Sequence, residues 1–400
     1  MLRKLTEKFI VGLLTLSGFT TSIIVLLIVV FLFREGLGIF GKSPVEEGLV
    51  LVTGKANHVK DLSPQQIKDI FDGKITHWNE VGGSHDSIVL FDVNMITDYY
   101  PEDSIGENFE NLPRLLSQIF VTNPSIIGSF PAKYADEHFG GNVIHVKQIT
   151  PSNFLSSREW FPSARPVNQY GVLPLILGTI WVSLFAILFA LPLGLAVAIY
   201  MAEIADERVR RLLKPVIELL AGIPSVVYGF FGLVVIVPYL QKLFNLPVGE
   251  SALAGSIILA IMALPTIITI SEDAIRNTPR AMKEASLALG ATRWQTISKI
   301  IVPYSASGIT AAAILGVGRA IGETMAVLMV TGNAAVIPHS LLEPVRTIPA
   351  TIAAELGETS QGSMHYEALF ALGCILFLIT LVINLSVEYV TNRRNKRFSS

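Results

Sequence analysis

The sequence predicts an all-α membrane protein that crosses the bilayer about six times and carries a small α/β domain outside it. Three observations lead to this fold class. Only 16% of the 400 residues are charged and 51% are hydrophobic, with a mean hydropathy of +0.55, whereas soluble domains carry about 25% charged residues. The apolar residues form runs of roughly 20, the length that a helix needs to cross a bilayer. One long polar segment, residues 34–168, separates the first run from the rest.

Each apolar run predicts one transmembrane helix, because a helix satisfies its own backbone hydrogen bonds in lipid. The first run follows Arg3, Lys4 and Lys8. It exceeds the roughly 7–15 residues of a signal-peptide core, and no small-x-small cleavage site follows it. Residues 1–33 are therefore interpreted as an uncleaved anchor helix. The expected spans are Phe9–Phe33, Val172–Met201, Gly222–Leu240, Leu253–Ile270, Ser305–Val330 and Ala368–Tyr389.

Lys and Arg in the short loops predict the orientation, since cytoplasmic loops are enriched in both. Basic residues gather at the N-terminus, in residues 208–214 and 276–299, and in the tail 391–400. The opposite short loops offer little beyond Lys242 and Arg346. We therefore expect an inner-membrane protein with both termini in the cytoplasm and residues 34–168 outside. A loop of that length crosses whatever its own charge.

Residues 36–43 match the P-loop pattern GxxxxGKS, but their context argues against a nucleotide site. A P-loop lies between a strand and a helix. Here a membrane helix comes first, and Pro44 biases Ser43 towards an extended conformation. The net charge of −2 gives no reason to expect nucleic acid, Cys374 is the only cysteine, and the histidines show no metal-ligand spacing. We predict no cofactor, metal or catalytic residue, and no enzyme.

The external segment has local signals for a small α/β domain. Ser63 is placed to cap a helix with Pro64 at its first position, and Gly73 can end that helix. Residues 87–93 and 142–146 predict short strands.

Two stretches of this segment, Leu62–Gly83 and Asn123–Gly128, resemble periplasmic phosphate-binding proteins. In that family an Arg-Ser-Asp-Gly-Ser-Gly-Thr-like loop wraps the anion. At the matching place this chain has Phe91-Asp92-Val93-Asn94-Met95-Ile96-Thr97. The resemblance implies a shortened relative without the anion loop, which would act as a docking surface or a lid and not as a second binding site.

The segment Arg280–Pro303 has the local chemistry of two short helices. Thr278 is expected to cap the first helix with Pro279 at its first position, and Gly290 to end it in a left-handed conformation. Residues 292–295, Thr-Arg-Trp-Gln, form a capping box that restarts a helix. This chemistry alone fits an amphipathic surface helix and a docking site for another protein equally well.

The spacing in this segment resembles the EAA signature of ABC-importer permeases. That signature runs Glu-Ala-Ala, three residues, Gly, nine residues, Ile, one residue, Leu-Pro. Here Ser286 and Val302 replace the second Ala and the Leu, both conservatively. The resemblance implies a type I permease fold over residues 171–390, with a loop that seats in a cleft of a separate ATP-binding subunit. The residues it assigns to ATPase coupling are Glu284, Ala285, Gly290, Ile300 and Pro303.

Three further stretches, Leu220–Gly232, Ser271–Arg276 and Gly318–Ala326, resemble the PstC-type permeases of phosphate-specific ABC importers. The last one contains Arg319 and Glu323 within an apolar run. A charge at the centre of a membrane helix costs about 2.5–3.5 kcal/mol on insertion scales, so such residues are functional candidates.

Arg319 and Glu323 are four residues apart and are expected to share one helix face. Gly318 and Gly322 beside them are expected to let a neighbouring helix pack closely. Arg offers a planar fork that matches phosphate oxygens, and an acidic group would repel sulfate more than hydrogen phosphate, which can donate a hydrogen bond to it. We therefore assign both residues to the substrate path. An internal ion pair that only holds the helix is the alternative.

The predicted function is the permease subunit of an ABC importer that moves inorganic phosphate inward, driven by a separate cytoplasmic ATPase. The implied partners are a second permease subunit, two ATP-binding subunits and an external phosphate-binding protein, all at the lipid bilayer. Three alternatives remain open. One is a permease for sulfate or molybdate. Another is a secondary transporter or channel, although the internal repeats common in such folds are not evident. The third is a phosphate sensor with the external segment as its receptor.

Overall fold

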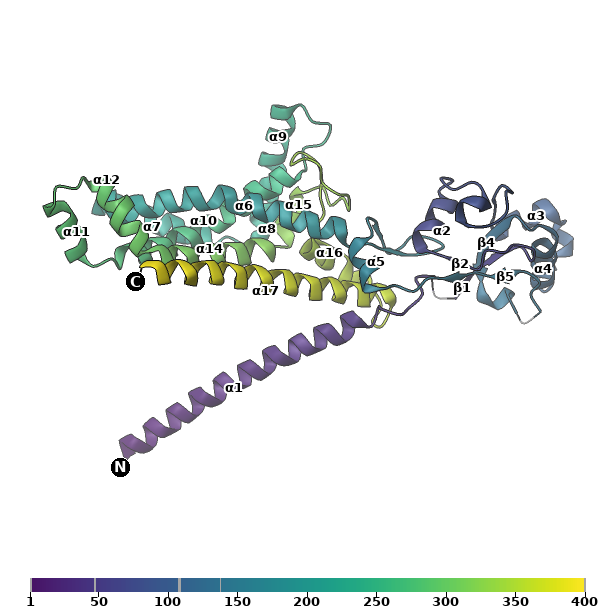
Figure 1. Cartoon of the computed structure of the whole chain (residues 1–400), viewed down its shortest axis with the longest axis horizontal. Helices are drawn as coiled ribbons and strands as arrows, with labels where there is room; N and C mark the ends of the chain where they lie inside the picture. Colours follow the sequence, from purple (N-terminus) through teal and green to yellow (C-terminus); the bar gives the residue numbers. More distant parts are fainter. Residues whose placement is uncertain (1, 47, 107–108, 137, 399–400) are drawn as a thin grey trace. The chain divides into compact units, whose positions relative to one another are not determined.

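The computed structural model describes residues 2–398 except 47, 107–108 and 137, and the last two residues of the basic tail lie outside the described part. The chain forms two compact units (Figure 1). We call residues 38–172 the insert. Residues 2–37 together with 173–398 form the membrane unit.

Long apolar helices build the membrane unit. They are α1 (Leu2–Leu37), α6 (Leu173–Ile199), α8 (Ser225–Phe231) with α9 (Val237–Phe244), α10 (Ala252–Arg276), α14 (Ala306–Ile321) and α17 (Met364–Phe398). A π-helical turn, Tyr200–Ile204, extends α6, and another, Gly232–Ile236, joins α8 to α9. Among the described residues, five helices are long and apolar enough to span a membrane, or six if a pair bent by 68° at Ser305 counts as one span. This confirms the predicted fold class.

The fifth expected span, Ser305–Val330, is not one continuous helix. Helix α14 ends at Ile321 with Gly322 as its cap, residues 322–324 are not helical, and α15 (Met325–Val330) follows. Glycine is among the poorest helix formers, and Gly322 lies at the break. The sequence prediction was wrong here because a continuous apolar run was taken for a continuous helix.

Shorter helices complete the unit. They are α7 (Glu207–Gly222), α11 (Arg280–Ala288), α12 (Arg293–Thr296), α13 (Val302–Tyr304) and α16 (Ile348–Glu355), with a π-helical turn at Ile297–Ile301 and a 3-10 turn at Leu356–Glu358. Helices α7 and α16 were not among the expected elements.

Helix α10 lies at the centre of the membrane unit, with α6 and α14 packed beside it (Figure 1). Its residues Ile258, Leu259 and Met262 are buried in the main apolar cluster. Small residues allow close packing of the neighbours. A Cβ on Gly194 of α6 would lie 2.7 Å from Ile267, and one on Gly316 of α14 would lie 3.0 Å from the same side chain.

The P-loop-like motif begins inside helix α1. Its first residue, Gly36, faces α17 so closely that a Cβ would lie 2.8 Å from Cys374 Sγ and 2.9 Å from the Ala371 amide nitrogen. Phe31 and Phe370 continue this contact edge to face, with ring centroids 5.6 Å apart. The glycine therefore serves helix packing.

A four-stranded sheet of order β3-β4-β1-β5 forms the centre of the insert. Strand β1 (Leu49–Thr53) pairs antiparallel with β4 (Ile126–Pro131) and β5 (Asn142–Val143), and β3 (Val89–Phe91) runs parallel to β4. Two further pairs are β2 (Asp61–Leu62) with β6 (His145–Val146) and β7 (Trp160–Phe161) with β8 (Gln169–Tyr170).

Helices cover both faces of this sheet. Adjacent strand residues alternate between two cores: Val52 and Ile126 pack with α4 (Leu112–Thr122), whereas Leu51 and Ile127 pack with α2 (Pro64–Phe71). The remaining helices are α3 (Ile96–Tyr99) and α5 (Pro151–Ser156), and 3-10 turns lie at Trp78–Val81, Val93–Met95, Glu102–Ser104 and Ala132–Tyr134. The predicted small α/β domain is therefore confirmed as a three-layer fold.

The predicted start of α2 is confirmed in detail. The Ser63 hydroxyl accepts a hydrogen bond from the Gln66 amide (3.2 Å), and the Gln66 side chain accepts one from the Ser63 amide (2.9 Å). Gly73 follows the helix in a left-handed conformation, φ +73°. The two ends of the insert meet at an antiparallel bridge between Val45 and Val167.

Candidate functional site: the coupling loop and the α14 break

We call residues 280–303 the coupling loop. Its two helices, α11 and α12, meet at Gly290, which has φ +87°. Only glycine adopts this conformation without strain. A Cβ at Gly290 would meet nothing within 4 Å, so the backbone angle alone requires the glycine.

The second helix restarts as the sequence predicts. The Thr292 hydroxyl accepts from the Gln295 amide (3.2 Å), and the Gln295 side chain accepts from the Thr292 amide (2.8 Å). The hydroxyls of Ser286 and Thr296 lie 3.0 Å apart and link the two helices. Ser286, one of the two departures from the EAA signature, thus has a structural role within the loop.

The predicted cap at Thr278 is wrong. Helix α11 begins at Arg280, and its N-cap Pro279 makes no side-chain cap bond. The Thr278 side chain is buried, and its hydroxyl lies 3.1 Å from that of Ser305. Contact with a residue 27 positions away competes with local capping. The short-range spacing of the sequence does not reveal such a contact.

The five predicted coupling residues fall into two groups. Glu284, Ala285 and Gly290 are exposed, whereas Ile300 and Pro303 are half-buried. The first group therefore lies on a surface that is open in this chain, and the second group is partly covered by it.

Exposed apolar side chains that were not predicted flank this open surface. Leu289 is 89% exposed and Trp294 is 64% exposed. A cavity of ≈ 380 Å³ lies beside Trp294, with Leu287, Ile297 and Lys283 also lining it. The sequence feature that could have predicted them is the presence of large apolar residues near a left-handed glycine in a basic loop. Such a surface suits a protein partner, because monomeric proteins seldom leave large apolar side chains clustered in water.

Arg319 and Glu323 do not share a helix face. Arg319 lies in the last turn of α14, and Glu323 lies in the non-helical break that follows. Both are half-buried, and within the described part of the chain neither takes part in an ion pair. The structure thus gives no support to the alternative of an internal Arg319–Glu323 pair.

Near the α14 break, two of the stretches that resemble PstC-type permeases pack against each other. Helix α8 packs on α15 so closely that a Cβ on Gly229 would lie 2.9 Å from Ala326 Cα. The neighbouring Tyr228 donates its hydroxyl to the Leu220 carbonyl (2.7 Å). Arg319 lies in the last turn of α14, and the short break after that helix leads into this contact between α8 and α15.

Gly318 and Gly322 contact no neighbouring helix of this chain. A Cβ on Gly318 would have nothing within 4 Å, and one on Gly322 would meet only the Gly318 carbonyl oxygen, at 3.5 Å. Within the described residues, the predicted close packing at this step is therefore not seen.

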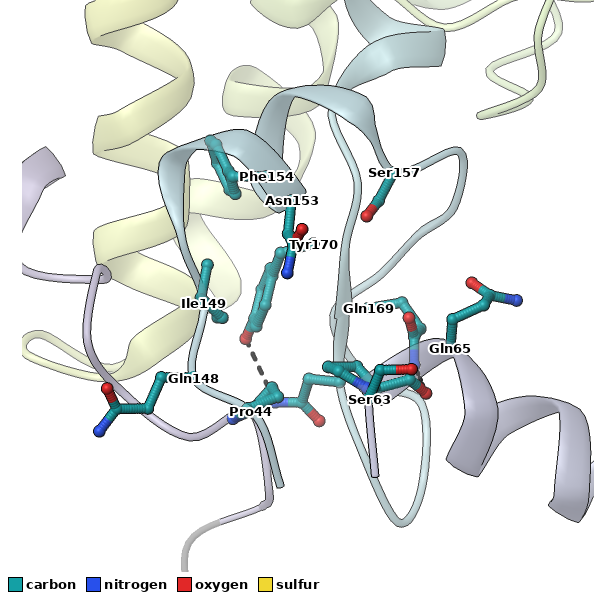
Figure 2. A pocket seen from close by; sticks show the side chains of 12 residues that line it. Pro44, Ser63, Gln65, Gln148, Ile149, Asn153, Phe154, Ser157, Gln169 and Tyr170 are labelled. Carbon is teal, nitrogen blue, oxygen red and sulfur yellow. Dashed lines mark hydrogen bonds between the residues drawn. The ribbon is translucent and has the colours of Figure 1, made fainter. Parts of the chain in front are cut away.

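Figure 2 shows a cavity of ≈ 220 Å³ in the insert. Side-chain amides and hydroxyls line it together with two aromatic rings, and the described residues on its wall carry no formal charge. Those with polar side chains are Ser63, Gln65, Gln148, Asn153, Ser157, Asn168, Gln169 and Tyr170. It offers no cationic side chain to an anion.

A second cavity, ≈ 430 Å³, is lined by Phe91–Met95, part of the stretch compared above with the anion loop of phosphate-binding proteins. Its wall includes Asp92, Asn94 and Arg165. The Arg165 guanidinium is paired with Glu46 at 3.0 Å, and the Asn94 backbone amide donates to the Asp92 carboxylate at 2.8 Å. Arg165 is the only cation on the described wall, and it already has a carboxylate partner.

Comparison with known protein families identifies the membrane unit. Residues 190–396 match the binding-protein-dependent transport system inner membrane component family. The chain belongs to this family. It is therefore a multi-pass transport permease with the type I ABC-importer permease fold, and not an enzyme. Residues 35–97 match the PBP superfamily domain, which supports the predicted resemblance of the insert to binding proteins.

The chain is similar to several transport permeases. A probable ABC transporter permease protein, YqgH of Bacillus subtilis, is 44% identical over 249 residues, covering 62% of this chain and 80% of the relative. The phosphate transport system permease protein PstC of Mesorhizobium japonicum is 39% identical over 264 residues, covering 61% and 80%. An inward-facing structure of the MetNI methionine ABC transporter matches at 20% identity with a TM-score of 0.43, covering 56% of this chain and 94% of that one.

Proposed function

We propose that this chain is the permease subunit of an ABC importer that carries inorganic phosphate across the inner membrane. The observation that supports this most is Arg319. It is a half-buried cation in the last helical turn before the α14 break, within a stretch that resembles PstC-type permeases. Relatives named as phosphate transport permeases support the same substrate. A guanidinium binds phosphate oxygens in a planar, bidentate geometry.

The proposed partners follow from the exposed surfaces. The coupling loop faces the cytoplasm, where Leu289 and Trp294 are covered by an ATP-binding subunit. A second permease subunit packs against the open small-residue step at Gly318 and Gly322, since such steps let helix backbones approach closely. The full complex has two permease subunits, two ATP-binding subunits and an external phosphate-binding protein, and both termini of this chain are cytoplasmic.

The insert is proposed to be a docking surface or a lid for the binding protein. Its acidic residues outnumber its basic ones. The Arg165 side chain at the ≈ 430 Å³ cavity is exposed and already has Glu46 as its ion-pair partner. Both features disfavour an anion, so the insert is not the phosphate receptor.

Uptake into proteoliposomes that contain the complete complex tests the function. We expect accumulation of labelled phosphate that requires ATP and the binding protein, and weak competition by excess sulfate or molybdate. Equal competition by sulfate would instead indicate an oxyanion permease of another specificity. Uptake that follows the membrane potential without ATP would indicate a secondary transporter.

A further inference from the structure

The feature that carries a further inference is an ion pair between Glu203 and Lys283. Glu203 lies in the π-helical turn Tyr200–Ile204 that ends α6, and Lys283 lies in the first half of α11. The pair therefore joins a transmembrane helix directly to the coupling loop, across 80 residues of sequence.

Its surroundings distinguish this pair from its neighbours. The Glu203 and Lys283 side chains are 13% and 22% exposed. The nearby pair Arg211–Glu207 is 76% and 73% exposed and lies within one helix. Exposed pairs contribute little because water and salt screen them, whereas partly buried charges interact more strongly. In the described part of the chain, no other ion pair links the coupling loop to another element.

The π-helical turn is a joint between three elements. Its last backbone bond runs from the Ala205 amide to the Tyr200 carbonyl (2.8 Å). Arg210 of α7 donates to the carbonyls of Met201 (2.8 Å) and Ala202 (3.4 Å). Such turns often mark functional sites in helices. Here the turn places Glu203 where α6, α7 and α11 meet.

A second contact attaches the other half of the coupling loop to the same helix end. Ile297 and Ile301 are buried with Ala198 of α6 and Ile275 of α10. The Ser286–Thr296 hydroxyl contact holds the two halves of the loop together. The loop therefore has one electrostatic and one apolar attachment to α6.

Helix α6 leads from this joint to the helix that carries Arg319. Gly316 of α14, three residues before Arg319, packs against Ile187 of α6 and Ile267 of α10. A displacement of α11 thus has a continuous packed route to the α14 break. A coupling measurement is the test of whether such a packed route transmits movement.

We infer that the Glu203–Lys283 ion pair transmits movement of the coupling loop to α6, so that both are positioning residues for ATP-driven transport. This inference rests on the proposed function, because it requires an ATPase that moves the loop. The pair holds α6 to α11 while the apolar contact at Ile297 permits small rotations.

The test uses the complete complex in proteoliposomes and measures phosphate transported per ATP hydrolysed. Glu203→Gln and Lys283→Gln should each lower this ratio about fivefold or more, the lower end of typical coupling between sites. Combining Glu203→Lys with Lys283→Glu should restore it by reforming the pair in reverse. Glu207→Gln and Arg211→Gln remove the exposed pair on α7 and should leave the ratio unchanged.

Each outcome decides the inference. An unchanged ratio in the single variants overturns it, and so does a charge reversal that fails to restore the ratio. If the single variants do not assemble, the reversed pair alone decides: a normal ratio supports the ion pair as the link, and a lowered ratio overturns it. Failure of the wild-type complex to transport phosphate would instead contradict the proposed function.

Discussion

Arg319 carries the largest share of the proposed chemistry. It lies in the last turn of α14, and no described carboxylate is paired with it. A cation without a partner in a membrane segment is costly to keep, so a function that needs the charge explains its presence.

We predict that Arg319→Gln abolishes phosphate uptake, by about 100-fold or more, because the lost charge-assisted contacts are worth roughly 1.5–3 kcal/mol each. Arg319→Lys should retain partial uptake, since it keeps the charge and loses the planar fork. Transport assays check both. Copurification with the ATP-binding subunit controls for assembly, and full uptake by the Gln variant would remove Arg319 from the substrate path.

Glu323 is placed in the break rather than on the Arg319 helix face, which leaves its carboxylate in non-helical backbone. Hydrogen phosphate can donate a hydrogen bond to a carboxylate, and sulfate at neutral pH cannot.

We therefore expect Glu323→Gln to weaken discrimination against sulfate about tenfold, the effect of roughly 1.4 kcal/mol, while phosphate uptake without competitor continues. The measurement is the sulfate concentration that halves phosphate uptake. A variant with unaltered discrimination would assign the selectivity to other groups.

At the scale of elements, the coupling loop depends on one backbone angle. Gly290 has φ +87° and open space around its missing Cβ. No side chain obstructs a new residue there, so a substitution that keeps the backbone amide, which donates to the Leu287 carbonyl (3.0 Å), tests the angle itself.

Gly290→Pro should uncouple ATP hydrolysis from uptake, because proline fixes φ near −65° and cannot join the two helices. Gly290→Asn is the matched control. Asparagine tolerates the left-handed region and should keep most of the uptake. The ratio of phosphate transported to ATP hydrolysed checks both variants. Equal ratios in the two variants would show that the angle is not what the loop needs.

The contact of α1 with α17 offers a test of stability. Gly36→Leu would force a side chain against Cys374 and the Ala371 backbone, and overpacking costs typically about 1–3 kcal/mol. The thermal midpoint of the purified permease in detergent should fall. Gly18→Leu on the same helix meets nothing within 4 Å and should leave the midpoint unchanged. An equal effect at both positions would contradict the packing role.

At the scale of the whole molecule, the insert has its own cores and joins at its two ends through the Val45–Val167 bridge. Replacing residues 48–164 by a short Gly-Ser linker should therefore let the membrane unit assemble. We expect uptake to persist at saturating binding protein, with a higher half-saturating concentration of that protein. Complete loss of uptake at every concentration, in a complex that assembles, would make the insert an essential receptor.

Local chemistry was readable from the sequence because it acts within a few residues. The apolar runs predicted the spanning helices, and the N-cap Ser63, the capping box at Thr292 and the left-handed Gly290 lie where the sequence places them. The EAA spacing predicted the permease family that residues 190–396 match.

Only the tertiary structure decided which distant residues meet. The Thr278 hydroxyl lies beside that of Ser305 and caps no helix, and the run 305–330 is interrupted at Gly322. Gly229 packs against Ala326, and Glu203 pairs with Lys283. Each of these depends on how helices far apart in sequence pack against one another. The periodicity and spacing within one segment carry no information about the side chains that another segment brings to it.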